Sequence, residues 1–150
     1  MTAIFPLWLI PLFPFAGFLI NGLLGRHLPK WLVTTVALLA PLGSFLALLG
    51  NAFGMFGDMP VLDIPNSLTF GQWINIGTLH VDFSFVLDQL SLIMLLVITG
   101  VGFLIHVYSV GYMAHDKGYA RYFSYLNLFL FFMTTLVLAG NALLMFVGWE

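Results

Sequence analysis

Three ionisable side chains occur within or beside long apolar stretches, and they are the residues best placed to do chemistry. Glu150 ends an otherwise apolar run, and Asp88 and His106 both lie within another, Asp88 near its start. A charged carboxylate in hydrocarbon costs several kcal/mol, so an acidic residue there marks an ion or proton path by default. We therefore predict that Glu150 is a proton-relay residue. The structural alternative is a protonated glutamate that joins two helices by a hydrogen bond.

Asp88 and His106 are weaker candidates for the same path. Asp88 is expected about one turn into a helix, where the alternative role is a helix-start group favoured by the helix dipole. His106 is expected about 27 Å further along that helix, near its other end, where the alternative is a packed or hydrogen-bonded side chain. Asn127, Thr134 and Thr135 are most simply explained as groups that hydrogen-bond between helices.

The composition predicts an all-α membrane protein. Hydrophobic residues make up 61% of the chain and charged residues 7%, whereas a soluble domain carries about a quarter charged residues. The apolar runs are continuous rather than alternating, which disfavours a β-barrel and leaves helices to satisfy backbone groups in lipid. The chain has no cysteine, which excludes thiolate metal sites and cysteine-held iron–sulfur clusters. We expect no metal, no cofactor and no nucleic-acid partner for this chain.

The apolar runs divide residues 1–150 into a single membrane domain with five predicted helices, at about 4–24, 31–53, 85–109, 122–138 and 141–150. The first four approach or exceed the roughly 20 residues that a spanning helix needs. About ten residues cannot cross a bilayer of roughly 30 Å at 1.5 Å per residue. We therefore expect this to be the N-terminal piece of a longer polytopic bundle, cut within its fifth helix.

The basic residues predict the orientation. All four fall in the first and third connections, which lie on one side of the membrane: Arg26, Lys30, Lys117 and Arg121. By the positive-inside rule that side is the cytoplasm, so the N-terminus is outside. The loop 54–84, which contains three Asp and no Lys or Arg, is then an outer loop. Glu150, nine residues past Asn141, is expected about 13 Å from the outer end of its helix.

The outer loop also shows a strand pattern. Residues 79–85 alternate apolar and polar side chains, and Gly77-Thr78 separates them from the stretch 70–76. This period of two predicts a short hairpin on the outer face. Two interpretations stay open, a docking edge for a neighbouring subunit and a lid over the helix ends.

Several segments together resemble one family. They are 86–94 (VLDQLSLIM), 104–113 (LIHVYSVGYM), 121–123 (RYF), 125–129 (YLNLF) and 148–150 (GWE). This combination resembles the largest antiporter-like membrane subunit of proton-pumping NADH:quinone oxidoreductase, respiratory complex I, in its bacterial form. The resemblance is densest from 83 to 150.

The resemblance implies a proton-translocating subunit of the bacterial inner membrane and the N-terminal part of an antiporter-like fold with inverted five-helix repeats. It also implies that Glu150 works with a lysine of a later helix. NAD, flavin, iron–sulfur clusters and quinone would then belong to partner subunits, with a second antiporter-like subunit as neighbour. Two alternatives remain, the large subunit of a multisubunit sodium/proton antiporter and a purely structural membrane subunit. Gly148-Trp149-Glu150 favours the redox-linked subunit over the antiporter.

Overall fold

The protein is a helical bundle with one short hairpin. A computed structural model describes residues 7–52 and 66–150. In chain order the elements are α1 (Leu9–Leu23), α2 (Lys30–Ala52), β1 (Asn66–Ile76), β2 (Leu79–Leu87), α3 (Gln89–Tyr112), α4 (Tyr119–Leu138) and α5 (Ala142–Trp149). The predicted helical membrane bundle and its hairpin are both confirmed.

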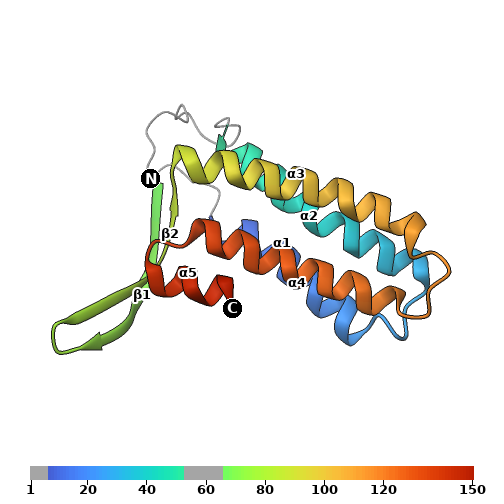
Figure 1. Ribbon diagram of the computed structural model, residues 1–150, viewed down its shortest axis with the longest axis horizontal. Coiled ribbons are helices and arrows are strands. Elements are labelled where there is room, and N and C mark those ends of the chain that lie inside the picture. The colour runs from blue at the N-terminus through green and yellow to red at the C-terminus, as the bar shows by residue number, and fades with distance from the viewer. Residues whose placement is uncertain (1–6, 53–65) are drawn as a thin grey trace.

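The four long helices pack side by side with the hairpin at one end (Figure 1). We call this the hairpin end. The connections from α1 to α2 and from α3 to α4 lie at the opposite end, and they contain or adjoin all four Lys and Arg residues of the chain. We call it the basic end. The prediction that these residues share one side of the bundle holds, while the membrane face to which that side belongs stays a prediction.

Three of the described helices, α2, α3 and α4, are long and apolar enough to cross a membrane. Helix α1 is apolar but has 15 residues, which is fewer than the roughly 20 that a span needs. The first predicted helix began at residue 4, and residues 1–6 lie outside the described part of the chain.

Helix α3 begins later than the apolar pattern predicts. The prediction began at residue 85, but residues 85–87 continue strand β2 and Asp88 has extended backbone angles, φ −111° and ψ 179°. Its side chain accepts a hydrogen bond from the Ser91 N–H at 2.6 Å, and the Ser91 hydroxyl accepts one from the Asp88 N–H at 2.7 Å. This reciprocal cap starts the helix. Asp88 is therefore the N-cap residue and does not lie one turn inside the helix.

The hairpin has the predicted turn. Ile76 pairs with Leu79 in an antiparallel ladder, and Gly77 has φ +60°, a conformation that glycine adopts without strain. The register shifts twice along β1. Phe85 and Leu87 of β2 pack into the helical core, whereas Phe70, Trp73 and Ile76 of β1 are exposed.

Two buried apolar clusters occupy the two ends of the bundle. The cluster at the hairpin end includes Leu48, Leu95 and Leu138, and the cluster at the basic end consists of Val33, Ala37, Tyr119 and Phe123. Along both α3 and α4 the sequence between these clusters contains buried polar side chains, among them Thr99, His106, Asn127 and Thr134. The middle of the bundle is therefore its polar part.

Candidate functional site

Helix α5 is held in place by the hairpin and by a close contact with α4. Asn141 caps α5 by accepting a hydrogen bond from the Leu144 N–H at 2.9 Å, and its side-chain amide donates to the Asp82 carbonyl of β2 at 2.6 Å. The Gly140 N–H also donates to the Ser84 carbonyl of β2 at 2.9 Å. The turn before α5 is thereby tied to β2, which favours the interpretation of the hairpin as a lid over the helix ends.

Gly148 determines how closely α5 approaches α4. A Cβ atom at this position would lie 2.8 Å from the N, Cα and Cβ atoms of Leu136. Only glycine permits this approach without displacing backbone atoms. The residue just before Trp149 and Glu150 is therefore the contact point between the two helices.

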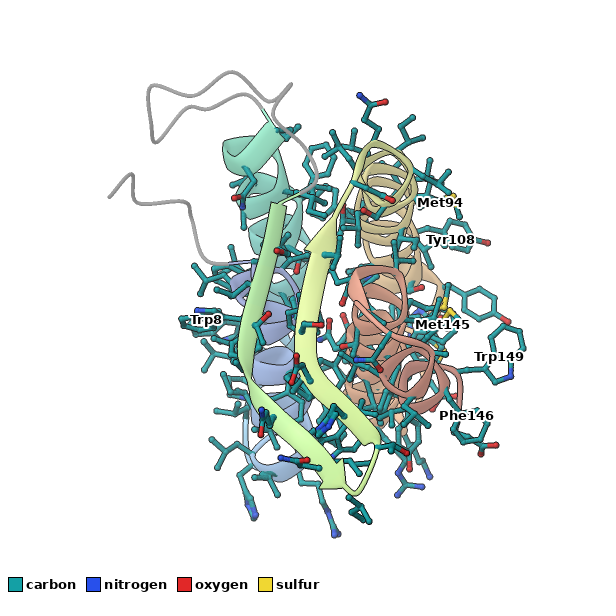
Figure 2. All side chains as sticks on the ribbon, turned by 90° about the vertical axis from the view of Figure 1, so that its left-hand side faces the viewer. Trp8, Met94, Tyr108, Met145, Phe146 and Trp149 are labelled. Carbon is teal, nitrogen blue, oxygen red and sulfur yellow. The ribbon has the colours of Figure 1, made fainter. Side chains whose placement is uncertain are left out.

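This contact places Glu150 nearer the hairpin end than the sequence predicts. The count of about 13 Å from Asn141 assumes that α5 begins level with the end of α4. In the structure α5 begins beyond that end and crosses the last turn of α4, which contains Leu136 (Figure 1). Glu150 follows the contact by two residues and is exposed on the described chain. The neighbouring Phe146 and Trp149 also point away from the bundle (Figure 2).

Asp88 acts in the structure as a helix cap at the hairpin end. The Ser91 N–H that donates to its carboxylate lowers its pKa below the ordinary value, and the Ser91 hydroxyl adds to that effect. A carboxylate held ionised by backbone donors suits a helix N-terminus. The helix-start interpretation of Asp88 therefore accounts for its contacts.

His106 is buried and has a polar partner on each side of its ring. Its side chain is 1% exposed. Nδ1 lies 2.7 Å from the Gly102 carbonyl of the same helix, and Nε2 lies 3.1 Å from Oδ1 of Asn127 on α4. The Phe123 ring packs nearby, with its centroid 6.2 Å from that of the imidazole. His106 and Asn127 thus form a polar bridge between α3 and α4.

Asn127 is enclosed from the other side by α1 and α2. A Cβ atom at Gly17 of α1 would lie 2.9 Å from Asn127 Nδ2 and 2.7 Å from the Ala40 Cβ of α2. Asn127 Nδ2 is buried with no hydrogen-bond partner among the described residues, and the same holds for Oδ1 of Asn21, one turn further along α1. Asn21 donates through Nδ2 to the Val33 carbonyl at 3.4 Å.

The other polar residues predicted on α4 do not join helices. Thr134 donates to the carbonyls of Leu130 and Phe131, and Thr135 donates to that of Phe131, all within α4 itself. Helical threonines commonly satisfy their hydroxyl in this way. The interhelical prediction is therefore right for Asn127 and wrong for Thr134 and Thr135.

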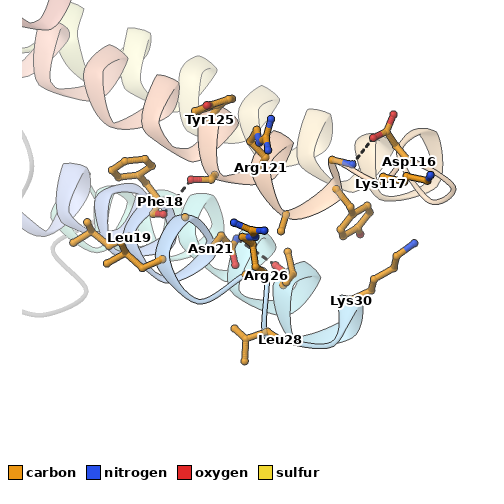
Figure 3. Close-up of a pocket in the computed structure, with 18 of the residues that line it drawn as sticks. Phe18, Leu19, Asn21, Arg26, Leu28, Lys30, Asp116, Lys117, Arg121 and Tyr125 are labelled. Carbon is orange, nitrogen blue, oxygen red and sulfur yellow. Dashed lines mark hydrogen bonds between the residues drawn. The ribbon is translucent and has the colours of Figure 1, made fainter.

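A cleft of about 920 Å³ opens at the basic end between α1 and α4 (Figure 3). Asn21 lies on its wall together with all four basic side chains of the protein, Arg26, Lys30, Lys117 and Arg121. The Lys30 ammonium donates to the Ala114 carbonyl at 2.9 Å and lies 5.7 Å from the Tyr119 ring centroid. The cleft connects the basic end with Asn21.

The structure does not bring the three predicted site residues together. Asp88 and Glu150 lie toward the hairpin end, and His106 lies about 27 Å from Asp88 along α3 at 1.5 Å per residue. Within the described ranges no group of three or more His, Asp or Glu side chains could hold a metal ion. Sequence reasoning missed Asn21 as a buried polar residue. The signal was a lone amide in an apolar helix, four residues after a glycine.

Comparison with known proteins identifies relatives of one kind. Residues 73–123, from β1 into α4, match the family model described as the N-terminus of chain 5 of NADH-ubiquinone oxidoreductase, complex I. NADH-quinone oxidoreductase subunit L of Mycobacterium tuberculosis is 44% identical over 145 residues, which cover 95% of this chain and 22% of that protein. Subunit L of Escherichia coli is 55% identical over 78 residues, 52% of this chain and 13% of that protein.

The similarity extends to eukaryotic relatives. NADH-ubiquinone oxidoreductase chain 5 of Allomyces macrogynus is 36% identical over 138 residues, which cover 91% of this chain and 21% of that protein. The chain thus spans about a fifth of the length of the relatives that it matches over nearly its whole length. The segment matched by the family model contains Asp88 and His106, while Asn127 and Glu150 lie beyond it.

Proposed function

We propose that this chain is part of a proton-translocating membrane subunit of NADH:quinone oxidoreductase. The chain belongs to the family of complex I subunit L and chain 5, over the N-terminal region that it shares with these relatives. The subunit couples quinone reduction elsewhere in the complex to proton movement through buried charged groups. NAD, flavin, iron–sulfur clusters and quinone are bound by partner subunits, and a second antiporter-like subunit is its neighbour in the bacterial inner membrane.

The observation that carries this proposal is the position of Glu150. It ends an apolar helix that is capped by Asn141 and pressed against α4 at Gly148. A carboxylate held at a defined place at the end of a membrane helix serves as a proton carrier when a nearby cation can stabilise its charge and then withdraw. The close contact at Gly148 defines that place, since it brings α5 against Leu136 of α4 two residues before Glu150.

The partner cation comes from outside the described chain. All four Lys and Arg residues lie at the basic end, whereas α5 crosses α4 near the hairpin end. We propose that a lysine of a later helix approaches Glu150 and that its approach and withdrawal change the proton occupancy of the carboxylate. The basic end faces the cytoplasm, which places the N-terminus outside.

The experiment that tests the proposal begins with affinity capture of the complete natural protein from mildly solubilised membranes. The captured material is assayed for quinone-dependent NADH oxidation and, after reconstitution, for exchange of sodium against protons. NADH oxidation that co-purifies with the protein supports the proposal. A stable complex that exchanges sodium for protons and lacks this oxidation contradicts it in favour of an antiporter. A complex with neither activity contradicts it in favour of a structural subunit.

A further inference from the structure

The hydrogen-bond partners of His106 indicate which of its two ring nitrogens carry protons. A backbone carbonyl only accepts hydrogen bonds, so the 2.7 Å contact with the Gly102 carbonyl requires a proton on Nδ1. The amide oxygen of Asn127, 3.1 Å from Nε2, also only accepts. With the amide in this orientation the two contacts are those of a ring protonated on both nitrogens, which is the charged form of His106.

The neutral ring can be satisfied just as well at the same place. When the Asn127 amide turns by 180°, Nδ2 replaces Oδ1 and donates to an unprotonated Nε2. The two ends of an amide group have nearly the same shape, so the turn leaves the space beside Gly17 filled as before. The Nδ1–H bond to Gly102 is kept in both states.

We propose that His106 and Asn127 form a second proton-binding site, in which a turn of the Asn127 amide keeps the imidazole fully hydrogen-bonded in both its neutral and its protonated form. The exchange is balanced, because one proton adds to the lone pair of Nε2 and the amide presents Oδ1 in place of Nδ2. As a station on a proton path the site rests on the proposed function. As a proton-binding site it does not.

Asn127 is the group in contact with the imidazole whose turn can accommodate both protonation states. Its hydrogen bonds and ring contact are with the Gly102 carbonyl of α3 and, from α4, the Asn127 amide and the Phe123 ring. None of these titrates. Beyond Asn127 lie Gly17 of α1 and Ala40 of α2, which are uncharged. Among the described residues no Asp, Glu, Lys or Arg hydrogen-bonds to His106, and the hydroxyl of the nearby Tyr122 bonds to Ser109 instead, at 3.0 Å.

A route for the proton from the basic end would pass Asn21 and Asn127. In the orientation with His106 protonated, Asn127 Nδ2 is a buried donor without an acceptor, and Asn21 Oδ1 is a buried acceptor without a donor. Each such group costs about 1–3 kcal/mol. Helical side chains lean toward the N-terminus of their helix, so Asn21 leans toward Gly17, the glycine against Asn127. One water molecule between them would satisfy both amides, and Asn21 lines the cleft at the basic end.

The test reads the protonation of His106 directly. The complete natural protein, labelled with ¹⁵N-histidine and held in lipid bilayers, is examined by solid-state NMR between pH 8 and pH 5. His106→Gln protein identifies the signal by subtraction. His115→Gln is the matched control, because it removes an exposed histidine at the basic end. At pH 8 we expect the neutral Nδ1–H tautomer of His106, and on acidification the imidazolium, with the Nε2–H tautomer absent throughout.

A second variant tests the role of the amide. Asn127→Asp presents only acceptors to Nε2, so we expect proton binding by His106 to tighten at least tenfold, which moves its titration by one pH unit or more. The proposal is overturned if His106 shows the Nε2–H tautomer, if it stays neutral down to pH 5, or if Asn127→Asp leaves its titration unchanged. None of these readouts depends on proton pumping, so failure here is distinct from failure of the proposed function.

Discussion

Gly148→Ala tests whether the contact between α5 and α4 fixes the position of Glu150. The added methyl group would lie 2.8 Å from three atoms of Leu136, two of them in the backbone. Carbon atoms pack at about 3.5–4.0 Å, so α5 must move away by roughly 1 Å. Overpacking of this kind costs about 1–3 kcal/mol, which is roughly a 5- to 150-fold loss in the folding equilibrium constant.

Gly111→Ala is the matched control for this prediction. It lies in α3, where a Cβ atom meets nothing within 4 Å, so the better helix propensity of alanine should stabilise by up to about 1 kcal/mol. The assay compares both variants with the wild type by reversible unfolding of the complete protein in mixed micelles. If Gly148→Ala proves as stable as Gly111→Ala, α5 does not pack on α4 as described and the argument for a fixed Glu150 fails.

Three further predictions use the same unfolding assay. Asn141→Ala removes the cap of α5 and the bond to Asp82, and we expect it to lower stability by about 1–2 kcal/mol; an unchanged value would show that β2 does not anchor α5. Asp88 has a lowered pKa, so the free energy that it contributes to folding is present above its ordinary pKa of about 3.9 and is lost as the pH falls through the lowered value. The loss of stability below about pH 4 should therefore be smaller in Asp88→Asn than in the wild type. An equal loss in the two proteins would contradict the cap. Thr134→Val should cost less than about 1 kcal/mol, because the hydroxyl bonds only within α4; a larger loss would mean that Thr134 joins helices after all.

In this protein the sequence predicts the helices and strands better than it predicts the side-chain contacts between them. The alternation over residues 79–85 is enough to find β2, because Val81, Phe83 and Phe85 on one face are half-buried or buried, whereas His80 and Asp82 on the other face are exposed. The sequence predicts too early a start for α3, because residues 85–87 are apolar and an apolar run suits a buried strand as well as a membrane helix. The Asp88–Ser91 cap that separates the two elements lacks the usual Glu or Gln at its third position.

The polar contacts depend on packing that no local pattern contains. Thr134 and Asn127 look alike in the sequence, as single polar residues in an apolar helix, yet one bonds back to its own helix and the other bonds across to His106. Both side chains can bond back to the preceding turn of their own helix, as Asn51 of α2 does by donating to the Ala47 carbonyl at 2.9 Å. The identity of the partner, 21 residues away, follows only from how α3 and α4 pack.

The number of protons translocated per NADH oxidised is the most direct measure of the central claim. It should be determined for the complete enzyme carrying Glu150→Gln, with Glu150→Asp as the control that keeps the ionisable group. We expect normal assembly of both variants, strongly reduced proton transfer in Glu150→Gln, and partly retained proton transfer in Glu150→Asp. Wild-type stoichiometry in assembled Glu150→Gln enzyme would contradict the assignment of Glu150 as a proton carrier.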